Sequence, residues 1–171
     1  GGVSRFDPVL AELLVSWFCP PAGLVLDPMA GGPVRGIVAT HLGRSYLGVD
    51  LLAAQVDANR ETAARWGLPP TWMVGDARAL VPTLDVQADY VLTCPPYWNR
   101  ERYSDDPRDL SAMRWPEFLQ AHHQIVAATL DRLRDDRFLT WVISDVRDSR
   151  GHLRHLPWIV LEQVESCGAR L

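Results

Sequence analysis

Short apolar segments that end at a polar residue alternate along this chain with longer segments of helical periodicity. Four apolar segments end just before Asp27, Asp50, Asp76 and Cys94. Short apolar strands that alternate with amphipathic helices favour a parallel sheet covered by helices on both faces. Such sheets bind ligands beyond the carboxyl ends of their strands. Four strands that each deliver a polar residue to one rim therefore predict a binding site at that rim.

The periodicity predicts where the individual elements lie. Strands are expected near 24–26, 46–49, 72–74, 90–93 and 138–143, and the segment 98–115, rich in charged and aromatic residues, is expected to be a loop. Helices are expected at 8–18, 33–42, 52–66, 116–133 and about 155–165, the first with Asp7 as its N-cap and Pro8 as its first residue. The expected apolar stripes are Leu10, Leu13, Leu14, Trp17 and Phe18 on the first helix, Val34, Ile37, Val38 and Leu42 on the second, and Phe118, His122, Ile125, Val126, Leu130 and Leu133 on the fourth.

Composition limits the class of protein. With 171 residues and 47% hydrophobic residues, the chain is expected to be one folded domain over 1–171. Its formal net charge is −4, so any contact with a nucleic acid must come from a local basic patch. All 17 basic residues are Arg, which excludes a catalytic lysine. The three cysteines lack C-x-x-C spacing and the five histidines lack metal-ligand spacing, so no metal site is predicted. Without a signal peptide or a membrane-length apolar run, a cytoplasmic location is expected.

A glycine-rich loop follows the first expected strand. Glycine lets a ligand approach the backbone closely, and the helix after Pro33 points its amides at the loop. The spacing Gly31-Gly32-x-x-x-Gly36 differs from the G-x-G-x-x-G of dehydrogenases, and no P-loop sequence is present. Asp50 follows Asp27 by 23 residues, a spacing that resembles that of the acid that binds ribose hydroxyls in nucleotide-binding sheets. The pattern therefore favours a nucleotide-like cofactor.

Two segments together resemble the signature motifs of the S-adenosylmethionine-dependent methyltransferases that modify exocyclic amines of DNA bases. Asp27-Pro28-Met29-Ala30-Gly31-Gly32 resembles the family's cofactor motif Asp-Pro-Phe-Ala-Gly-Ser-Gly, with Met29 in place of Phe and Gly32-Pro33 in place of Ser-Gly. Cys94-Pro95-Pro96-Tyr97 resembles the base-binding motif, with Cys94 in place of Asp, Asn or Ser. The resemblance runs from about Phe6 to about Arg154.

The resemblance implies a fold and a cofactor. The fold is a Rossmann-like class I methyltransferase α/β fold, with a central, mostly parallel sheet and helices on both faces. The family normally adds two antiparallel strands after the last helix, and the six residues after Glu165 do not contain them. The chain is then a fragment, another chain supplies the strands, or a strand is miscounted. The implied cofactor is S-adenosylmethionine, with Asp27 near the methionine amino group and Asp76 accepting from the adenine amino group. The expected cofactor contacts are Asp27, Pro28, Met29, Ala30, Gly31, Gly32, Asp50, Leu51, Asp76 and Ala77.

The second motif implies a pocket for a flipped base, because an exocyclic amine cannot be reached inside a duplex. Tyr97 would stack the base, the Pro95 carbonyl and Cys94 would hold its amine, and Pro96 would stiffen the turn. Adenine N6 is favoured over cytosine N4. A nucleophilic role for Cys94 is the less favoured alternative, because the cysteine that attacks cytosine C5 in other methyltransferases follows the proline. The resemblance further implies that the enzyme methylates DNA as part of a restriction–modification system.

DNA is the expected partner, and a homodimer or a partner chain would supply target recognition. Trp98, Arg100 and Arg102 in the loop, and Arg147 and Arg150 after the last strand, are the expected nucleic-acid contacts, because arginine with aromatics suits phosphate contact and stacking. A solvated, mixed-charge lid is the alternative for the loop. Methylation of RNA or of a protein glutamine amide is a second hypothesis, and an inactive, cofactor-binding regulatory subunit is a third.

Overall fold

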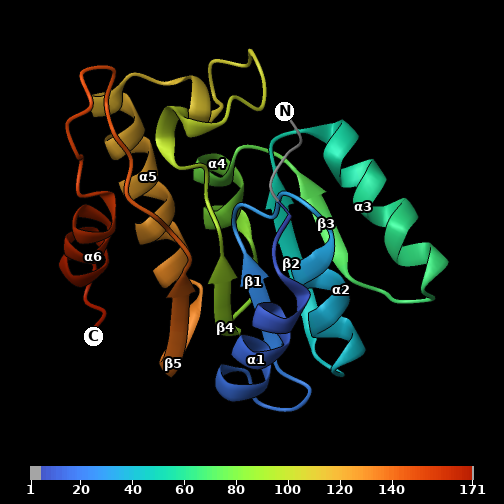
Figure 1. Ribbon diagram of the computed structural model, residues 1–171. Helices are drawn as coiled ribbons and strands as arrows, with labels where there is room; N and C mark the ends of the chain where they lie inside the picture. The colour runs from blue at the N-terminus through green and yellow to red at the C-terminus, as the bar shows by residue number, and fades with distance from the viewer. Residues whose placement is uncertain (1–4, 171) are drawn as a thin grey trace.

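The computed structural model describes residues 5–170, which form one five-stranded sheet in the order β3-β2-β1-β4-β5 (Figure 1). All four strand pairings are parallel, as the sequence predicts. The strands are β1 (Leu24–Asp27), β2 (Ser45–Asp50), β3 (Thr71–Val74), β4 (Ala88–Thr93) and β5 (Leu133–Trp141). Up to residue 170, no further strand joins the sheet after β5, and the remaining pairing is one antiparallel bridge between Arg147 and Leu153.

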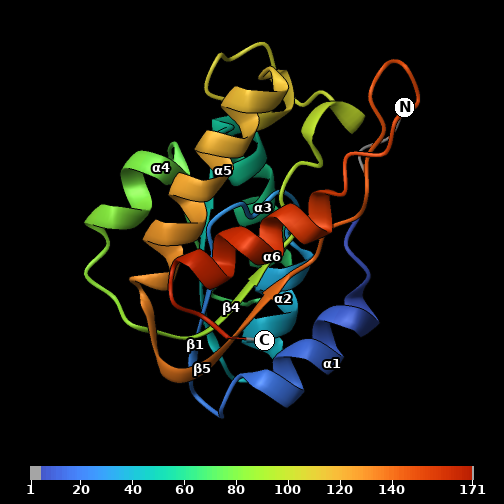
Figure 2. The same cartoon turned by 90° about the vertical axis from the view of Figure 1, so that its left-hand side faces the viewer.

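Helices cover both faces of the sheet (Figures 1 and 2). One face carries α1 (Pro8–Phe18), α2 (Val34–His41) and α3 (Ala53–Arg65). The other carries α4 (Ala77–Leu80) and α5 (Trp115–Leu130), and α6 (Leu156–Ser166) packs against α5. Three short 3₁₀ turns, η1 (Val81–Thr83), η2 (Trp98–Arg100) and η3 (Leu110–Ala112), lie in the connections.

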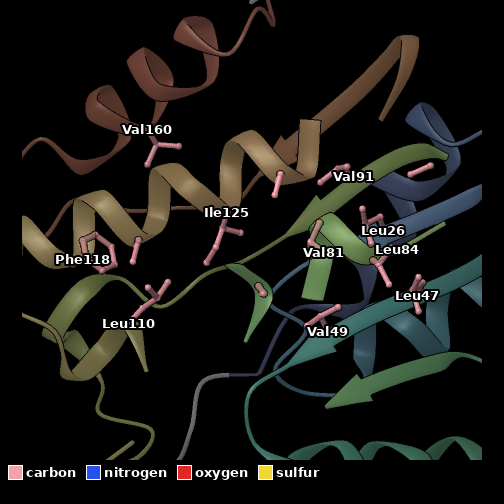
Figure 3. Packing of buried hydrophobic residues seen from close by; sticks show 14 of the residues in the cluster. Leu26, Leu47, Val49, Val81, Leu84, Val91, Leu110, Phe118, Ile125 and Val160 are labelled. Carbon is pink, nitrogen blue, oxygen red and sulfur yellow. The ribbon is translucent and has the colours of Figure 1, made fainter. Parts of the chain in front are cut away.

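Alternation along the strands divides the core into two apolar clusters. On β1, Val25 belongs to the cluster beneath α1 and α2, whereas Leu26 belongs to the cluster beneath α5. Successive side chains of a strand point to opposite faces, so a strand buried on both sides is apolar throughout. Figure 3 shows the cluster beneath α5. Phe118 and Ile125 lie on one side of α5, and Val160 of α6 lies on the opposite side of that helix.

Several helix predictions are correct at their ends. The Asp7 carboxylate accepts a hydrogen bond of 2.9 Å from the Leu10 amide, so it caps α1 as predicted. The fourth helix was predicted too long, because Leu133 lies in β5, opposite Ala88 of β4. Parallel pairing with β4 overrides the helical spacing of Leu133. The short helix α4 was not predicted, because four residues carry no periodicity.

The buried faces of α1 and α2 match the predicted stripes only in part, with Leu14 and Phe18 of α1 partly buried against the core. On α1 the fully buried residues are Ala11 and Val15, whereas Trp17 is 69% exposed. On α2 the buried residues are Arg35, Gly36 and Ala39, and Ile37 and Leu42 of the predicted stripe are partly buried and pack against the same core cluster. A β-carbon at position 36 would lie 2.7 Å from the Trp72 ring, so glycine lets α2 pack closely against the sheet. Hydrophobic spacing alone therefore misses the small residues that make the closest contact with the sheet.

None of the helices in the described residues combines the length and the apolar character needed to cross a membrane. Over residues 5–170 no cluster of three or more His, Cys, Asp or Glu side chains could hold a metal ion.

Candidate active site

A cavity of about 1720 Å³ lies over the carboxyl ends of the strands. Loops after β1, β2, β3 and β4 line it, together with the segment 5–10. We call the segment 98–114 the lid, and part of the lid also lines the cavity. The predicted site residues that line it are 28–32, Asp50, Leu51, Asp76, Ala77, 94–97, Arg100 and Arg102. The structure therefore brings both predicted motifs to one cavity, at the rim where a parallel sheet binds ligands.

Asp27, at the end of β1, does not line the cavity, because its carboxylate is engaged inside the protein. It is fully buried. Oδ2 accepts from Nε of Arg35 at 2.6 Å and from the Tyr46 hydroxyl at 2.8 Å, and Oδ1 accepts from the Thr93 hydroxyl at 2.7 Å. In this structure the Asp27 carboxylate, predicted to contact the methionine amino group, bridges β1, β2, β4 and α2. A buried carboxylate needs such partners, because removing it from water is otherwise costly.

The bridge fixes the shape of the glycine loop. Nη2 of Arg35 donates to the carbonyl oxygens of Met29 at 3.1 Å and of Ala30 at 2.9 Å. Gly31 has a φ of +50°, a conformation that glycine adopts at little cost. Its amide donates to Asp50 at 2.8 Å, and its carbonyl accepts from the buried Asn59 at 2.7 Å. The loop is therefore held in one conformation by the side chains around it.

The pKa values of the two acids at the ends of β2 and β3, Asp50 and Asp76, are shifted in opposite directions. Burial raises the pKa of Asp50, although the amides of Leu52 and Gly31 that bond it oppose the shift. Burial also raises the pKa of Asp76, but hydrogen bonds and charge from Arg78 outweigh this and lower the pKa overall. Each oxygen of a carboxylate can accept more than one hydrogen bond, so both acids retain capacity toward a ligand in the cavity.

The Cys94–Tyr97 turn projects from the end of β4 into the cavity. Thr93, bonded to Asp27, anchors its start, and Pro95 is buried. The Tyr97 hydroxyl lies 3.3 Å from Sγ of Cys94, within sulfur hydrogen-bond distance. Burial and the contact with Cys94 raise the pKa of Tyr97, so the phenol is neutral at physiological pH. The turn presents a half-buried aromatic ring beside a thiol.

The lid has an internal polar core of its own. The buried Asp109 accepts from the hydroxyls of Ser104 at 2.8 Å and Ser111 at 2.7 Å. At its base, the Trp98 indole donates to the Met113 carbonyl at 3.0 Å. Ion pairs such as Arg102 with Asp105 cover its outer surface. The mixed charges of the lid thus neutralise each other, and Arg100 and Arg102 still line the cavity.

The predicted nucleic-acid residues divide into two groups. Arg100 and Arg102 line the main cavity, whereas Trp98 does not. Arg147 lines a smaller pocket of about 460 Å³ that also includes Arg100, and Arg150 lines neither pocket. The lid and the segment after β5 therefore meet at Arg100, whose side chain borders both pockets.

Comparison with known proteins shows the fold. No protein-family model matches the sequence, and no curated protein matches it. A putative rRNA-methylase from Clostridium thermocellum superposes with a TM-score of 0.69 at 14% identity, over 98% of this chain and 86% of that one. A TehB-like SAM-dependent methyltransferase from Corynebacterium glutamicum superposes with a TM-score of 0.58 at 16% identity, over 92% and 71%. TrmN from Thermus thermophilus has a TM-score of 0.64 at 23% identity over 80% of this chain, which spans only 38% of TrmN.

The fold is the Rossmann-like fold of class I methyltransferases. This confirms the fold class expected from the two motifs.

Within this class I fold, sequence reasoning missed three residues that shape the site: Arg35, Tyr46 and Thr93. All three are buried and bond Asp27. One signal was available for Arg35, an arginine flanked by apolar and small residues in the first turn of a short helix. A charge in such a position is buried only if it is paired. Tyr46 and Thr93 carried no signal, because strand residues with hydroxyl groups are common.

Proposed function

We propose that this chain is the catalytic domain of an S-adenosylmethionine-dependent methyltransferase that acts on an exocyclic amine of a DNA base. One observation carries the proposal: the acid-bearing loops after β2 and β3 and the Pro-Pro-Tyr turn after β4 line one continuous cavity. A shared cavity lets donor and acceptor be held in line, which is the main requirement of methyl transfer. The class I fold and the methyltransferase descriptions of two structural neighbours support methyl transfer.

We assign the parts of the cofactor by analogy with the order of the strands in the sheet. Along the rim the strands run β3, β2, β1, β4. Asp76 after β3 would accept from the adenine amino group, and Asp50 after β2 would accept from the ribose hydroxyls. Leu51 and Ala77 flank these acids and would contact the adenosine rings. The loop 28–32 after β1 would hold the methionine part, which places the sulfonium methyl next to the turn after β4.

The reaction needs little from the protein besides positioning. Tyr97 would stack the flipped base, and the Pro95 carbonyl and Cys94 would accept from its amine. The bound cofactor would supply the methyl group: the amine nitrogen would attack the methyl carbon, and a nitrogen–carbon bond would form as the sulfur–carbon bond breaks. The nitrogen would then lose a proton to water, and S-adenosylhomocysteine would leave. Because Sγ of Cys94 also contacts the Tyr97 hydroxyl, most of the amine binding would fall to the Pro95 carbonyl.

The target base and the recognition surface belong to the same proposal. Adenine N6 is the favoured target and cytosine N4 the second. Arg100, Arg102 and Arg147 would contact phosphates, with Trp98 holding the base of the lid. The described residues are taken up by the sheet, its helices and the lid, so we propose that a second copy or a partner chain supplies target recognition.

RNA is the second candidate substrate. The Clostridium thermocellum neighbour is described as a putative rRNA-methylase, and the attack by a base amine would be the same. A single-stranded RNA base needs no extraction from a duplex, so RNA would react without the unpairing cost that DNA requires.

The test offers tritiated S-adenosylmethionine with duplex DNA, single-stranded DNA and RNA in parallel. Label in N6-methyladenine or N4-methylcytosine of DNA is the expected result. Stacking on an aromatic ring is worth about 1–3 kcal/mol per base, so Tyr97→Ala should lower kcat/KM roughly 5- to 150-fold. Trp158→Ala removes an exposed aromatic side chain of α6 outside the cavity and should leave activity unchanged.

The other outcomes identify which part of the proposal is wrong. Label found only in RNA would show that the substrate is RNA and not DNA. Cofactor binding without transfer to any nucleic acid would favour a regulatory subunit. Absence of cofactor binding would contradict the whole proposal.

A further inference from the structure

Arg35 has donors that its hydrogen bonds within residues 5–170 do not use. It is 4% exposed and lines the cavity. A guanidinium carries five N–H donors. Nε bonds Asp27 and Nη2 bonds the carbonyls of Met29 and Ala30, which accounts for three of them. Over residues 5–170, Nη1 has no hydrogen-bond acceptor. Because Arg35 lines the cavity, a ligand group bound there can meet this nitrogen.

The surroundings of Arg35 favour an anionic ligand group. The Phe6 ring covers one face of the guanidinium, with its centroid 4.8 Å from Cζ. An aromatic ring offers no acceptor for the edge of the group, so Phe6 does not occupy the two Nη1 donors. Burial lowers the pKa of Arg35, but the charge of Asp27 and further contacts raise it more, so the side chain stays cationic. A planar guanidinium matches the geometry of a carboxylate.

The position of Arg35 selects one part of the cofactor. Arg35 is the second residue of α2, directly after the glycine loop, and its bond to Asp27 places it at the ends of β1 and β4. Asp50 and Asp76 lie at β2 and β3, toward the other side of the sheet. If adenosine binds these acids, the amino-acid part of the cofactor must extend toward β1 and Arg35.

We propose that Nη1 of Arg35 binds the carboxylate of the methionine part of S-adenosylmethionine. This inference rests on the proposed function and adds a specific receptor to it. Arg35 then has three tasks: it neutralises Asp27, it holds the loop carbonyls with Nη2, and it binds the cofactor with Nη1. The carboxylate would complete the hydrogen bonding of the guanidinium.

Calorimetric titration with S-adenosylmethionine and with decarboxylated S-adenosylmethionine tests this assignment. The two ligands share the sulfonium and the amino group and differ in the carboxylate. A hydrogen bond to a charged group is worth enough to change affinity about 10- to 100-fold, so the wild-type protein should prefer the intact cofactor by that factor. In Arg35→Met the preference should fall to about one, because the carboxylate loses its partner.

Two further variants separate loss of carboxylate binding from loss of folding. Arg35→Met leaves Asp27 unpaired, so the double variant Asp27→Asn with Arg35→Met removes both buried charges and should show the same loss of preference. Tyr46→Phe is the matched control, because it removes a different donor to Asp27 and leaves Arg35 in place. It should keep the wild-type preference. Thermal unfolding with each ligand establishes which variants are folded.

The outcomes separate this inference from the proposed function. Equal wild-type affinity for the two ligands would overturn the role of Arg35 and leave the cofactor assignment intact. An unchanged preference in a folded Arg35 variant would do the same. A wild-type protein that binds neither ligand would contradict the proposed function, and the inference with it.

Discussion

Stability should depend on pH through the fully buried side chain of His122 on α5. Its two ring nitrogens have fixed and different partners. The Trp141 indole donates to Nε2 at 3.0 Å, so Nε2 carries no proton. Nδ1 lies 2.7 Å from Oε1 of Gln163, whose own amide nitrogen donates to the Leu119 carbonyl at 3.0 Å. The Gln163 oxygen therefore accepts from Nδ1, and the network stabilises a single neutral tautomer.

The size of the effect follows from the pKa of His122. Burial lowers this pKa from 6.5 to about 4, although the bond to Gln163 opposes the shift. The unfolded chain therefore takes up a proton at a higher pH than the folded protein, and stability is lost as the pH falls from about 6.5 through about 4. The difference between the two pKa values corresponds to about 3 kcal/mol in the free energy of unfolding. About 2 kcal/mol of this is lost between pH 7.5 and pH 5.

Urea unfolding of the wild type and of His122→Gln at both pH values measures the effect. Glutamine keeps a polar side chain but does not titrate, so the variant should lose about 2 kcal/mol less than the wild type between pH 7.5 and pH 5. His123→Gln removes the neighbouring exposed histidine and should behave as the wild type. Equal pH dependence in wild type and His122→Gln would refute the argument that burial and the tautomer network hold His122 neutral.

Three further substitutions test the core and the site. Gly48→Ala would place a β-carbon 2.8 Å from the Trp72 ring, so urea unfolding should show a loss of about 1–3 kcal/mol, and full stability would contradict the close packing. Thr93→Val removes a donor to Asp27 and should cost about 1–3 kcal/mol in the same assay, whereas no change would show that the bond contributes nothing. Phe118→Ala opens a cavity beneath α5 and should cost about 3–5 kcal/mol, and a loss below 1 kcal/mol would mean that the neighbouring side chains refill the space.

Much of the fold was predictable because its signals are local. Asp7 and Pro8 mark the start of α1, and the apolar runs at β1, β2 and β4 have the length and composition of buried strands. The errors share one cause. The burial of Gly36 on α2 and the end of α5 depend on contacts with distant segments, and Gly36 and Leu133 carry no local sign of those contacts.

The candidate site was predictable in its parts and not in its connections. The sequence alone placed Asp27, Asp50, Asp76 and Cys94 just beyond the ends of strands, and parallel strands deliver their carboxyl ends to one rim. Only the tertiary structure decided that Asp27 faces inward. Its partners Arg35, Tyr46 and Thr93 come from α2, β2 and β4, between 8 and 66 residues away in sequence. Whether a carboxylate faces a ligand or an internal cation depends on which donors the fold brings within hydrogen-bond distance, and sequence spacing does not encode that distance.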